Sequence, residues 1–368
     1  MTIQDKKQLP SLEALFQPYT NGALSLSNRL VMAPMTRGFA PGGVPGADVA
    51  AYYRRQAENG IGLIVTEGTV INHPASSANP NWPSFFGAEA LEGWSRVVAE
   101  VHEAGGKIIP QLWHLGTARK VGSLPNPEVL PAGPSGLDAQ GEKVNEPLTE
   151  SEIADLIEAY AQAAADAQST GFDGIELHGA HGYLIDQFFW ERTNQRTDKY
   201  GGDLVARTRF AVEVVQAIRQ KVGPDFPIVF RFSQWKGADY SAKLVQTPEE
   251  LEQFLAPLSD AGVDIFHAST RQFWQPEFEG SPLNLAGWTK KLTGKPVITV
   301  GSVALENDFA EHPERIQRLA DILEQGEADL VAIGRSLLAN PEWASKVRSH
   351  NTDDWATYDA KILATLNG

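Results

Sequence analysis

Two histidines and a tyrosine stand close together in the segment ELHGAHGY, which runs from Glu176 to Tyr183. Three interpretations fit this pattern. His178 and His181 could ligate a metal ion beside Glu176, could be hydrogen-bonded core residues, or could donate to a substrate oxygen while Tyr183 delivers a proton. The spacing does not choose among them. The metal hypothesis is the weaker functional one, because Glu67 is the only other carboxylate expected nearby.

A second group of residues has the composition of a phosphate site. Gly301 and Ser302 follow the apolar run KPVITV, and Gly334 and Arg335 follow ADLVAI. Small residues let backbone N–H groups approach a phosphate, and Arg335 adds a charged donor. Each glycine alone is more typical of a turn. The two pairs together favour phosphate binding.

Two polar residues end other apolar runs. Arg231 follows FPIVF, and Gln111 follows GKIIP. Arg231 could form a salt bridge inside the fold or face an anionic cofactor ring. Gln111 could bond to backbone, or its amide could meet a heterocycle edge that both donates and accepts. With the phosphate site and the histidine cluster, these residues suggest a site for flavin mononucleotide (FMN).

The elements that must position these residues form a repeated pattern of amphipathic helix, turn and short apolar run. Runs that are apolar on both faces are typical of buried parallel strands. The clearest helix begins at Thr149, which forms a capping box with Glu152. Eight strands alternating with helices predict a (β/α)8 barrel, with a doubly wound sheet as the alternative. The runs are Leu30–Ala33, Gly60–Thr66, Gly106–Gln111, Gly171–His178, Phe226–Arg231, Gly262–His267, Lys295–Val300 and Ala328–Ile333.

The chain is expected to form a single domain over residues 1–368, because no stretch resembles a linker. Asn21-Gly22 predicts an N-terminal hairpin over about 15–28 that closes the barrel floor. The barrel itself is expected over about 30–345, followed by a C-terminal tail, 346–368. The Gly- and Pro-rich stretch from Gly122 to Pro147 follows the third strand and predicts a long loop over the barrel mouth.

Composition narrows the function classes. The 368 residues include 31 Lys+Arg and 46 Asp+Glu, a formal charge of −15. An acidic chain without basic blocks is a poor ligand for nucleic acid or anionic membranes. The absence of cysteine excludes disulfides, iron–sulfur clusters and thiol nucleophiles. With no signal peptide and no long apolar run, the expectation is a cytoplasmic protein without a membrane or nucleic-acid partner.

Several long blocks, in order, resemble the old yellow enzyme family of FMN-dependent ene reductases. The resemblance extends from Leu15 to about Trp343. The blocks are LFQPYTNGALSLSNRLVMAPMTR, QLWHLG, GFDGIELHGAHGYLIDQFFWERTNQRTDKYGG, GKPVITVGSV and AIGRSLLANPE.

The resemblance implies a non-covalently bound FMN. It implies that the Thr36 hydroxyl lies near the flavin O4, that Gly68 passes close to the ring, that Gln111 pairs with the pyrimidine edge, and that Arg231 faces the N1/O2 region. A fixed cation there would stabilise the anionic reduced flavin. The residues implied to hold the cofactor are Ala33, Pro34, Met35, Thr36, Gly68, Gln111, Arg231, Gly301, Ser302, Gly334 and Arg335.

The resemblance also implies a reaction. NAD(P)H, with NADPH favoured, would reduce the flavin, and a small-molecule activated alkene would then accept hydride from flavin N5. Thr36 would take part in catalysis by tuning the redox potential of the flavin. His178 and His181 would bind the carbonyl or nitro oxygen, Tyr183 would protonate the substrate, and Trp113 would wall the pocket. The enzyme would be of the NADPH dehydrogenase type and a monomer or homodimer.

Other functions remain open from the sequence. An FMN-dependent desaturase or isomerase could use the same site. A metal-dependent barrel lyase or hydrolase could use His178 and His181, and a flavin-binding protein could lack turnover altogether. Trp82 and Phe85 are the candidates for the place of the family's tyrosine-bearing loop. No aromatic pair is evident near Tyr358, where the family often covers the flavin. His114, Arg119 and Trp274 are further residues within reach of the site.

Overall fold

Eight parallel strands form a closed barrel at the centre of the computed structural model, which describes residues 11–366. Around the barrel the order is β10, β3, β4, β5, β6, β7, β8 and β9, so each strand has two neighbours. This confirms the predicted (β/α)8 barrel and excludes the doubly wound sheet, which has open edges. The strands are β3 (Leu30–Met32), β4 (Leu63–Val70), β5 (Lys107–Trp113), β6 (Ile175–His181), β7 (Ile228–Lys236), β8 (Ile265–Ser269), β9 (Val297–Val300) and β10 (Leu330–Ile333).

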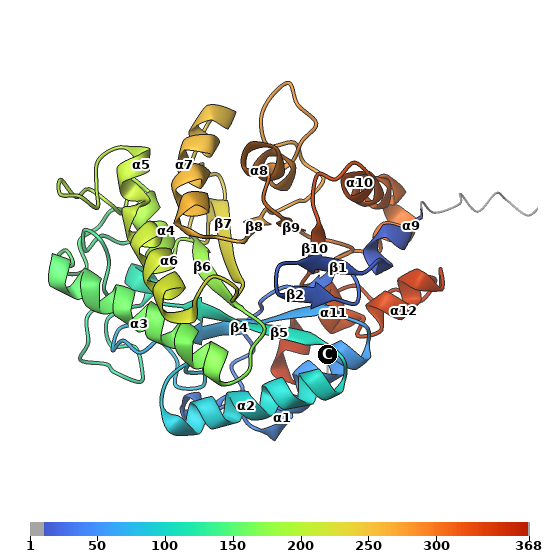
Figure 1. Cartoon of the computed structure of the whole chain (residues 1–368), viewed down its shortest axis with the longest axis horizontal. Helices are drawn as coiled ribbons and strands as arrows, with labels where there is room; N and C mark the ends of the chain where they lie inside the picture. Colours follow the sequence, from blue (N-terminus) through green and yellow to red (C-terminus); the bar gives the residue numbers. More distant parts are fainter. Residues whose placement is uncertain (1–10, 367–368) are drawn as a thin grey trace, which may run out of the picture.

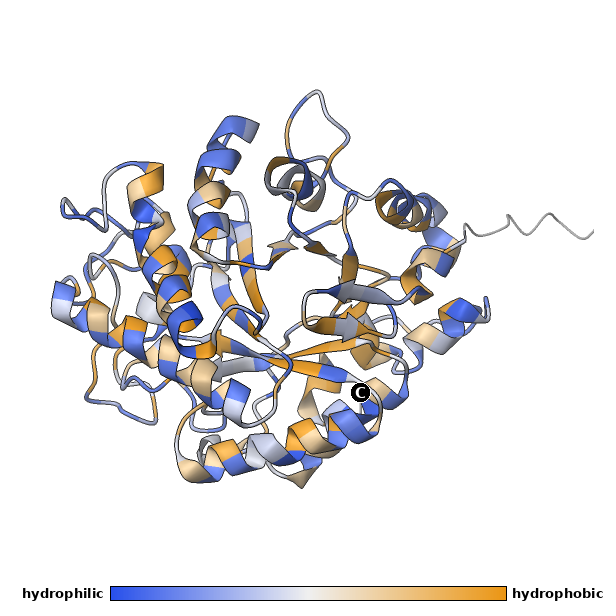
Figure 2. Ribbon diagram, in the orientation of Figure 1, coloured by the Kyte–Doolittle hydropathy of each residue, from blue (hydrophilic) through white to orange (hydrophobic). Residues whose placement is uncertain are grey.

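Helices surround the barrel on its outside (Figure 1). They carry mixed apolar and polar residues, whereas the strands are mostly apolar (Figure 2), as expected for a buried parallel sheet. The longer helices are α1 (Ala47–Glu58), α2 (Ala88–Glu103), α3 (Glu150–Ser169), α6 (Arg209–Val222), α7 (Pro248–Ala261), α8 (Leu285–Thr293) and α10 (Pro313–Glu324). The shorter ones are α4 (Leu184–Phe189), α5 (Leu204–Arg207), α9 (Asp308–Glu311), α11 (Arg335–Ala339), α12 (Trp343–Arg348) and the 3-10 turns η1 (Glu13–Phe16), η2 (Pro41–Gly43), η3 (Gly116–Ala118) and η4 (Ala360–Ala364).

The capping box predicted at Thr149 is present at the start of α3. The Thr149 hydroxyl accepts from the Glu152 N–H at 3.2 Å, and the Glu152 carboxylate accepts from the Thr149 N–H at 2.8 Å. Two otherwise unpaired N–H groups of the first turn are thereby satisfied.

An N-terminal hairpin closes the barrel floor, as predicted. Strands β1 (Tyr19–Asn21) and β2 (Leu24–Leu26) pair antiparallel around Gly22, whose φ is +55°. Leu24 and Leu26 are buried in the cluster of apolar side chains that fills the lower barrel interior. Figure 1 shows this hairpin lying across the ring of strands.

The segment 122–147 is a long loop, as predicted. Among the described residues it contains one isolated bridge and no named helix or strand. Buried Arg119 anchors the loop with a guanidinium that donates only to backbone carbonyls. Its partners include Ser77 after β4 and Ser123 and Asn126 within the loop. Arg119 is therefore a structural anchor in this structure.

The chain beyond α12 returns to the end of the barrel at which the strands have their carboxyl ends. The Trp355 indole donates to the Ala304 carbonyl at 3.2 Å, and Arg37 donates to the Thr365 carbonyl. The last described residues therefore contact the loop that follows β3. Within residues 11–366, none of the helices is both long and apolar enough to cross a membrane.

Candidate active site

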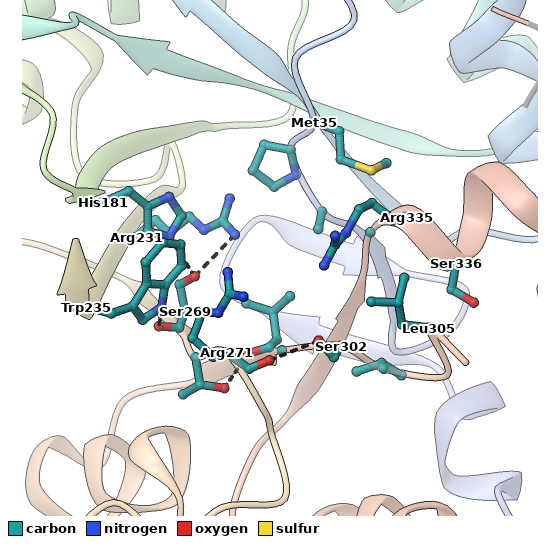
Figure 3. Close-up of a pocket in the computed structure, with 17 residues that line it drawn as sticks. Met35, His181, Arg231, Trp235, Ser269, Arg271, Ser302, Leu305, Arg335 and Ser336 are labelled. Atoms are coloured by element: carbon teal, nitrogen blue, oxygen red, sulfur yellow. Dashed lines mark hydrogen bonds between the residues drawn. The ribbon is translucent and has the colours of Figure 1, made fainter. Parts of the chain in front are cut away.

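A cavity of about 240 Å³ opens at the carboxyl ends of the strands, where barrel enzymes place their chemistry. Residues at the ends of six strands, β3, β6, β7, β8, β9 and β10, supply its walls, and ten of the lining residues are labelled in Figure 3. The predicted site residues that line it are Ala33, Pro34, Met35, His181, Arg231, Gly301, Ser302, Gly334 and Arg335.

The residues predicted to hold a phosphate lie together after β9 and β10. A side chain at Gly334 would extend toward Ala33 and Met35, whose nearest atoms are 3.8 and 3.7 Å from its position, so the glycine keeps the cavity wall open. Gly301 has a packing reason too, because a side chain there would meet the Thr270 carbonyl oxygen at 2.8 Å. The turn interpretation therefore also holds for Gly301.

Arg335 stands at the start of α11 and has no ion-pair partner among residues 11–366. Its guanidinium carbon lies 5.4 Å from the centre of the Tyr358 ring, and the group faces the cavity (Figure 3). A cation that stacks on an aromatic ring keeps its N–H donors available for an anion.

Arg231 lies on the opposite side of the cavity from Arg335 (Figure 3). It is buried, its Nε has no hydrogen-bond partner among residues 11–366, and its Nη2 reaches the Ser269 hydroxyl only at 3.5 Å. Burial lowers the pKa of Arg231, and the nearby Glu176 carboxylate opposes that effect. A buried cation with an unused donor is the feature expected of a site that receives an anionic or electron-rich ligand.

Gln111 is hydrogen-bonded inside the protein. Its amide nitrogen donates to Glu176 Oε1 at 2.8 Å, while Glu176 Oε2 lies 2.6 Å from His267 Nδ1. Pairing of that nitrogen with a flavin requires exchange of this bond, whereas the amide oxygen can accept without it. Both Glu176 oxygens are engaged, which removes Glu176 as a ready metal ligand beside His178.

His178, His181 and Tyr183 form one cluster beside the cavity. The His178 ring centre is 5.2 Å from that of His181 and 4.9 Å from that of Tyr183. His178 Nδ1 is buried without a partner, and His181 Nε2 lies 2.8 Å from the Ser269 hydroxyl. His181 also stacks on Trp235 at 4.1 Å (Figure 3).

Burial sets the protonation of this cluster. It holds the pKa values of His178 and His181 well below the ordinary histidine value, and the Arg231 charge lowers both further. Burial also raises the pKa of Tyr183. At neutral pH the site therefore holds two neutral imidazoles, which can donate hydrogen bonds, and a protonated phenol.

Aromatic side chains wall the cluster on the side of β4 and β5. Trp113 meets the Tyr183 ring edge-on at 5.0 Å, and Trp82 lies against Trp113 at the same distance. A side chain at Gly68 would meet the Trp113 ring at 2.6 Å, so the glycine makes room for the indole. Phe85 is a core residue that faces Trp94, which leaves Trp82 as the aromatic candidate in this loop.

Other expected residues lie elsewhere. The Thr36 side chain is exposed and does not line the cavity. His114 Nε2 lies 2.9 Å from His73 Nδ1, so it is engaged with another histidine. Trp274 is covered by Arg315 at 4.1 Å.

The metal hypothesis for His178 and His181 finds no further ligand. Within residues 11–366, one group of three potential ligands lies close enough to share an ion, and it consists of Glu306, Asp308 and His312. Arg315 pairs with Asp308 there at 2.9 Å, so a cation already balances that group.

Sequence reasoning missed Ser269, Trp235 and Arg271, which all line the cavity. Ser269 lies two residues beyond His267, so extending the strand by one step of its alternation would have placed it on the interior face. Trp235 lies near the end of β7, beyond the apolar run, and Arg271 lies in the loop after β8. Neither the residue types nor the spacing of Trp235 and Arg271 in the sequence indicates that they line the cavity.

Comparison with known proteins agrees with the barrel fold. The NADH:flavin oxidoreductase / NADH oxidase family model matches residues 14–354. The barrel and the match place the chain in a family of flavin oxidoreductases. The chain belongs to the old yellow enzyme family, whose members bind FMN and use NAD(P)H.

Named relatives span most of the chain. It is 37% identical over 343 residues to an NADH oxidase of Thermoanaerobacter brockii, covering 91% of this chain and 50% of that protein, so it spans half of the relative's length. It is 33% identical to 12-oxophytodienoate reductase 2 of Arabidopsis thaliana, covering 89% and 86% of the two chains. A structure of morphinone reductase in complex with tetrahydroNAD superimposes with a TM-score of 0.81 at 29% identity, covering 95% of this chain and 94% of the other.

Proposed function

We propose that this protein reduces the activated C=C bond of α,β-unsaturated carbonyl or nitro compounds, with NAD(P)H as the hydride donor and NADPH favoured. The observation that carries the proposal is the cluster of His178, His181 and Tyr183 at the edge of a cavity lined by three arginines. Relatives named as 12-oxophytodienoate reductase and morphinone reductase support the same class of reaction.

The residues present fit an FMN. Arg335 forms no ion pair with the described part of the chain, so its donors can meet a phosphate, and Gly334 leaves room for it beside the backbone. Arg231 offers an unpartnered buried N–H to an electron-rich ring. Ala33, Pro34 and Met35 would line the ring, with Gln111, Thr36 and Gly68 near its edge. When bound, FMN supplies the exchange of hydride between NAD(P)H and the alkene.

The protein's own groups would polarise the substrate. Neutral imidazoles of His178 and His181 would donate hydrogen bonds to the carbonyl or nitro oxygen, on which negative charge develops as hydride reaches the β-carbon. His178 Nδ1 is buried without a partner, and His181 would exchange its contact with Ser269 or use its other nitrogen. Removal of one such donor typically raises the barrier by about 2.7–4 kcal/mol.

Tyr183 would complete the reaction by protonating the α-carbon. Its raised pKa keeps the phenol protonated at neutral pH, so it is ready to act as a general acid. The net change adds one hydride and one proton across the C=C bond and oxidises NAD(P)H to NAD(P)⁺. Trp113 and Trp82 would restrict the width of the accepted alkene.

An anaerobic titration in one cuvette tests the proposal. The FMN-loaded protein would receive NADPH, or NADH in a parallel experiment, and then cyclohexenone, while the flavin absorbance is recorded. We expect bleaching by the nicotinamide and recovery on addition of the enone. Bleaching without recovery would reject the reductase assignment in favour of another acceptor or a desaturase. Failure of the protein to bind FMN would reject the cofactor assignment as well.

A further inference from the structure

The turn at the end of β6 carries two of the three residues of the histidine–tyrosine cluster, and one of them, His181, has an unusual backbone conformation. His181 has a φ of +65° and Gly182 a φ of +85°, and Tyr183 comes next, just before α4. A non-glycine residue at positive φ is disfavoured and persists only where surrounding contacts hold it. Something must therefore fix this turn.

A completely buried ion pair supplies one of the contacts that do so. Asp186 in α4 accepts the Gly182 N–H at 2.7 Å through Oδ2. Its Oδ1 accepts from Lys236 Nζ at 2.6 Å, and both side chains are 0% exposed. Burial raises the pKa of Asp186, while Lys236 and the Gly182 N–H oppose that rise.

The backbone ties the same groups to the end of β7. His181 pairs with Lys236 in the parallel register, and the Gly237 N–H donates to the His181 carbonyl at 2.9 Å. The Ser233 hydroxyl accepts the His181 N–H at 3.0 Å. The turn is thus held through α4 on one side and β7 on the other, with the ion pair as the link between them.

Stability alone does not account for charged residues at these positions. A buried ion pair is often no better than an apolar pair of similar volume, because both ions lose their hydration. What Asp186 provides that an apolar side chain cannot is an acceptor for Gly182. Lys236 provides the positive charge that holds the Asp186 carboxylate in place.

We propose that Lys236 and Asp186 are positioning residues for the reduction, and that they hold the 181–183 turn so that the imidazole and the phenol meet the substrate together. This inference rests on the proposed function. Neither residue touches the cavity, so their effect is exerted through His181 and Tyr183. Preorganised donors cost no rearrangement when charge develops on the substrate.

Two double variants separate positioning from packing. Asp186→Leu with Lys236→Met removes both charges and the acceptor, whereas Asp186→Asn with Lys236→Met keeps an acceptor for Gly182. Lys290→Met with Asp329→Leu is the matched control. Asp329 also pairs with a lysine, at 2.9 Å, and accepts a backbone N–H, but at the opposite end of the barrel.

Three quantities are measured on each FMN-loaded variant: the rate of reduction by NADPH, the rate of reoxidation by cyclohexenone, and hydrogen–deuterium exchange at the Gly182 amide. For Asp186→Leu with Lys236→Met we expect reoxidation to slow about 100-fold, as for a misplacement on the order of 1 Å. Reduction should stay within about threefold of wild type, and the Gly182 amide should exchange faster. The variant that keeps the acceptor should lose about tenfold in reoxidation. The control should change neither rate selectively.

Equal losses in both half-reactions, or wild-type reoxidation together with wild-type amide exchange, would overturn the positioning role. If the leucine variant does not fold, the asparagine variant decides by the same comparison, since unchanged reoxidation there overturns the proposal. Failure of wild-type protein to be reoxidised by the enone would reject the proposed function instead. The Gly182 exchange rates then still show whether the ion pair holds the turn.

Discussion

Replacement of Glu67 by glutamine should change how the stability of the protein depends on pH. Glu67 is only 2% exposed, and its Oε2 accepts the N–H groups of Arg37 and Gly38, each at 2.9 Å. Burial raises the pKa of Glu67 from 4.5 to about 7, and the two hydrogen bonds and the Arg37 charge limit the rise. The carboxyl thus holds the loop that follows β3 and is costly to ionise.

The sign of the effect follows from where the proton resides. Between pH 4.5 and about 7 the folded protein keeps the Glu67 proton, while the unfolded chain has lost it. The folded state binds more protons in this window, so its stability falls as the pH rises through it. At about 1.4 kcal/mol per pH unit, the loss reaches about 3 kcal/mol by pH 8.

Glutamine is neutral at every pH and should not show this loss. Urea unfolding with excess FMN would compare Glu67→Gln with wild type at pH 5 and pH 8. We expect the variant to gain about 2–3 kcal/mol relative to wild type between the two values. Any constant cost of the new amide cancels in that difference. Glu92→Gln, at an exposed site on α2, is the control. A parallel pH dependence of wild type and Glu67→Gln would refute the reasoning.

Three further outcomes are expected. Tyr183→Phe keeps the ring contacts with Trp113 but removes the acid, so stopped-flow reoxidation by an enone should slow about 10²–10⁴-fold while reduction by NADPH is unchanged. Equal slowing of both steps would count against the acid role. Arg231→Met should weaken FMN binding about 10- to 150-fold, the value of a charge-assisted hydrogen bond, in a fluorescence titration of the apoprotein. Unchanged affinity would mean that Arg231 does not face the cofactor. Thr149→Ala should lower the free energy of unfolding by about 1 kcal/mol in urea, since the α3 cap is lost. An unaltered urea midpoint would show that other contacts hold the first turn.

The barrel was predictable because its signal repeats. Each strand gives a short run that is apolar on both faces, and eight such runs separated by helices leave few other arrangements. Once the barrel is assumed, the carboxyl ends of the strands must converge at one end. That rule alone brought Arg231, Gly301 and Arg335 into one prediction, and the structure places them around one cavity.

The loops were harder to predict, because their paths do not follow a period. Trp82 and Phe85 are three residues apart and equally aromatic, yet one faces Trp113 and the other is in the core. Thr36 follows three cavity-lining residues but is exposed and does not line the cavity itself. In each case the deciding factor is the direction of one backbone turn, which depends on tertiary contacts.

The partners of buried polar groups were also not visible in the sequence. Asp186 and Lys236 are 50 positions apart, and nothing local marks them as a pair. Gln111 lies in β5 and Glu176 in β6, and only the register of these two strands sets them side by side. Hydrogen bonds of this kind are fixed by the fold and can be inferred only after it.

The interior of the barrel changes from apolar to polar along the strands. This gradient explains why polar groups that can hydrogen-bond a ligand gather at the cavity. On β7 the alternation brings Val229, Arg231 and Ser233 to the same face, and on β8 it brings Ile265, His267 and Ser269. The lower member of each set packs in the apolar cluster above the hairpin. The middle members lie in a buried polar layer, where every donor needs an acceptor.

Within that layer the Arg231 guanidinium is only partly hydrogen-bonded. The two oxygens of Glu176 contact Gln111 and His267, and neither forms a hydrogen bond with Arg231. Arg231 is left with a distant hydroxyl and an unpartnered Nε at the cavity wall. A buried guanidinium in this state is stabilised most by an acceptor that enters from the cavity, and under the proposed function an electron-rich flavin edge would be that acceptor. The same carboxylate that completes the polar layer therefore leaves Arg231 available to the ligand.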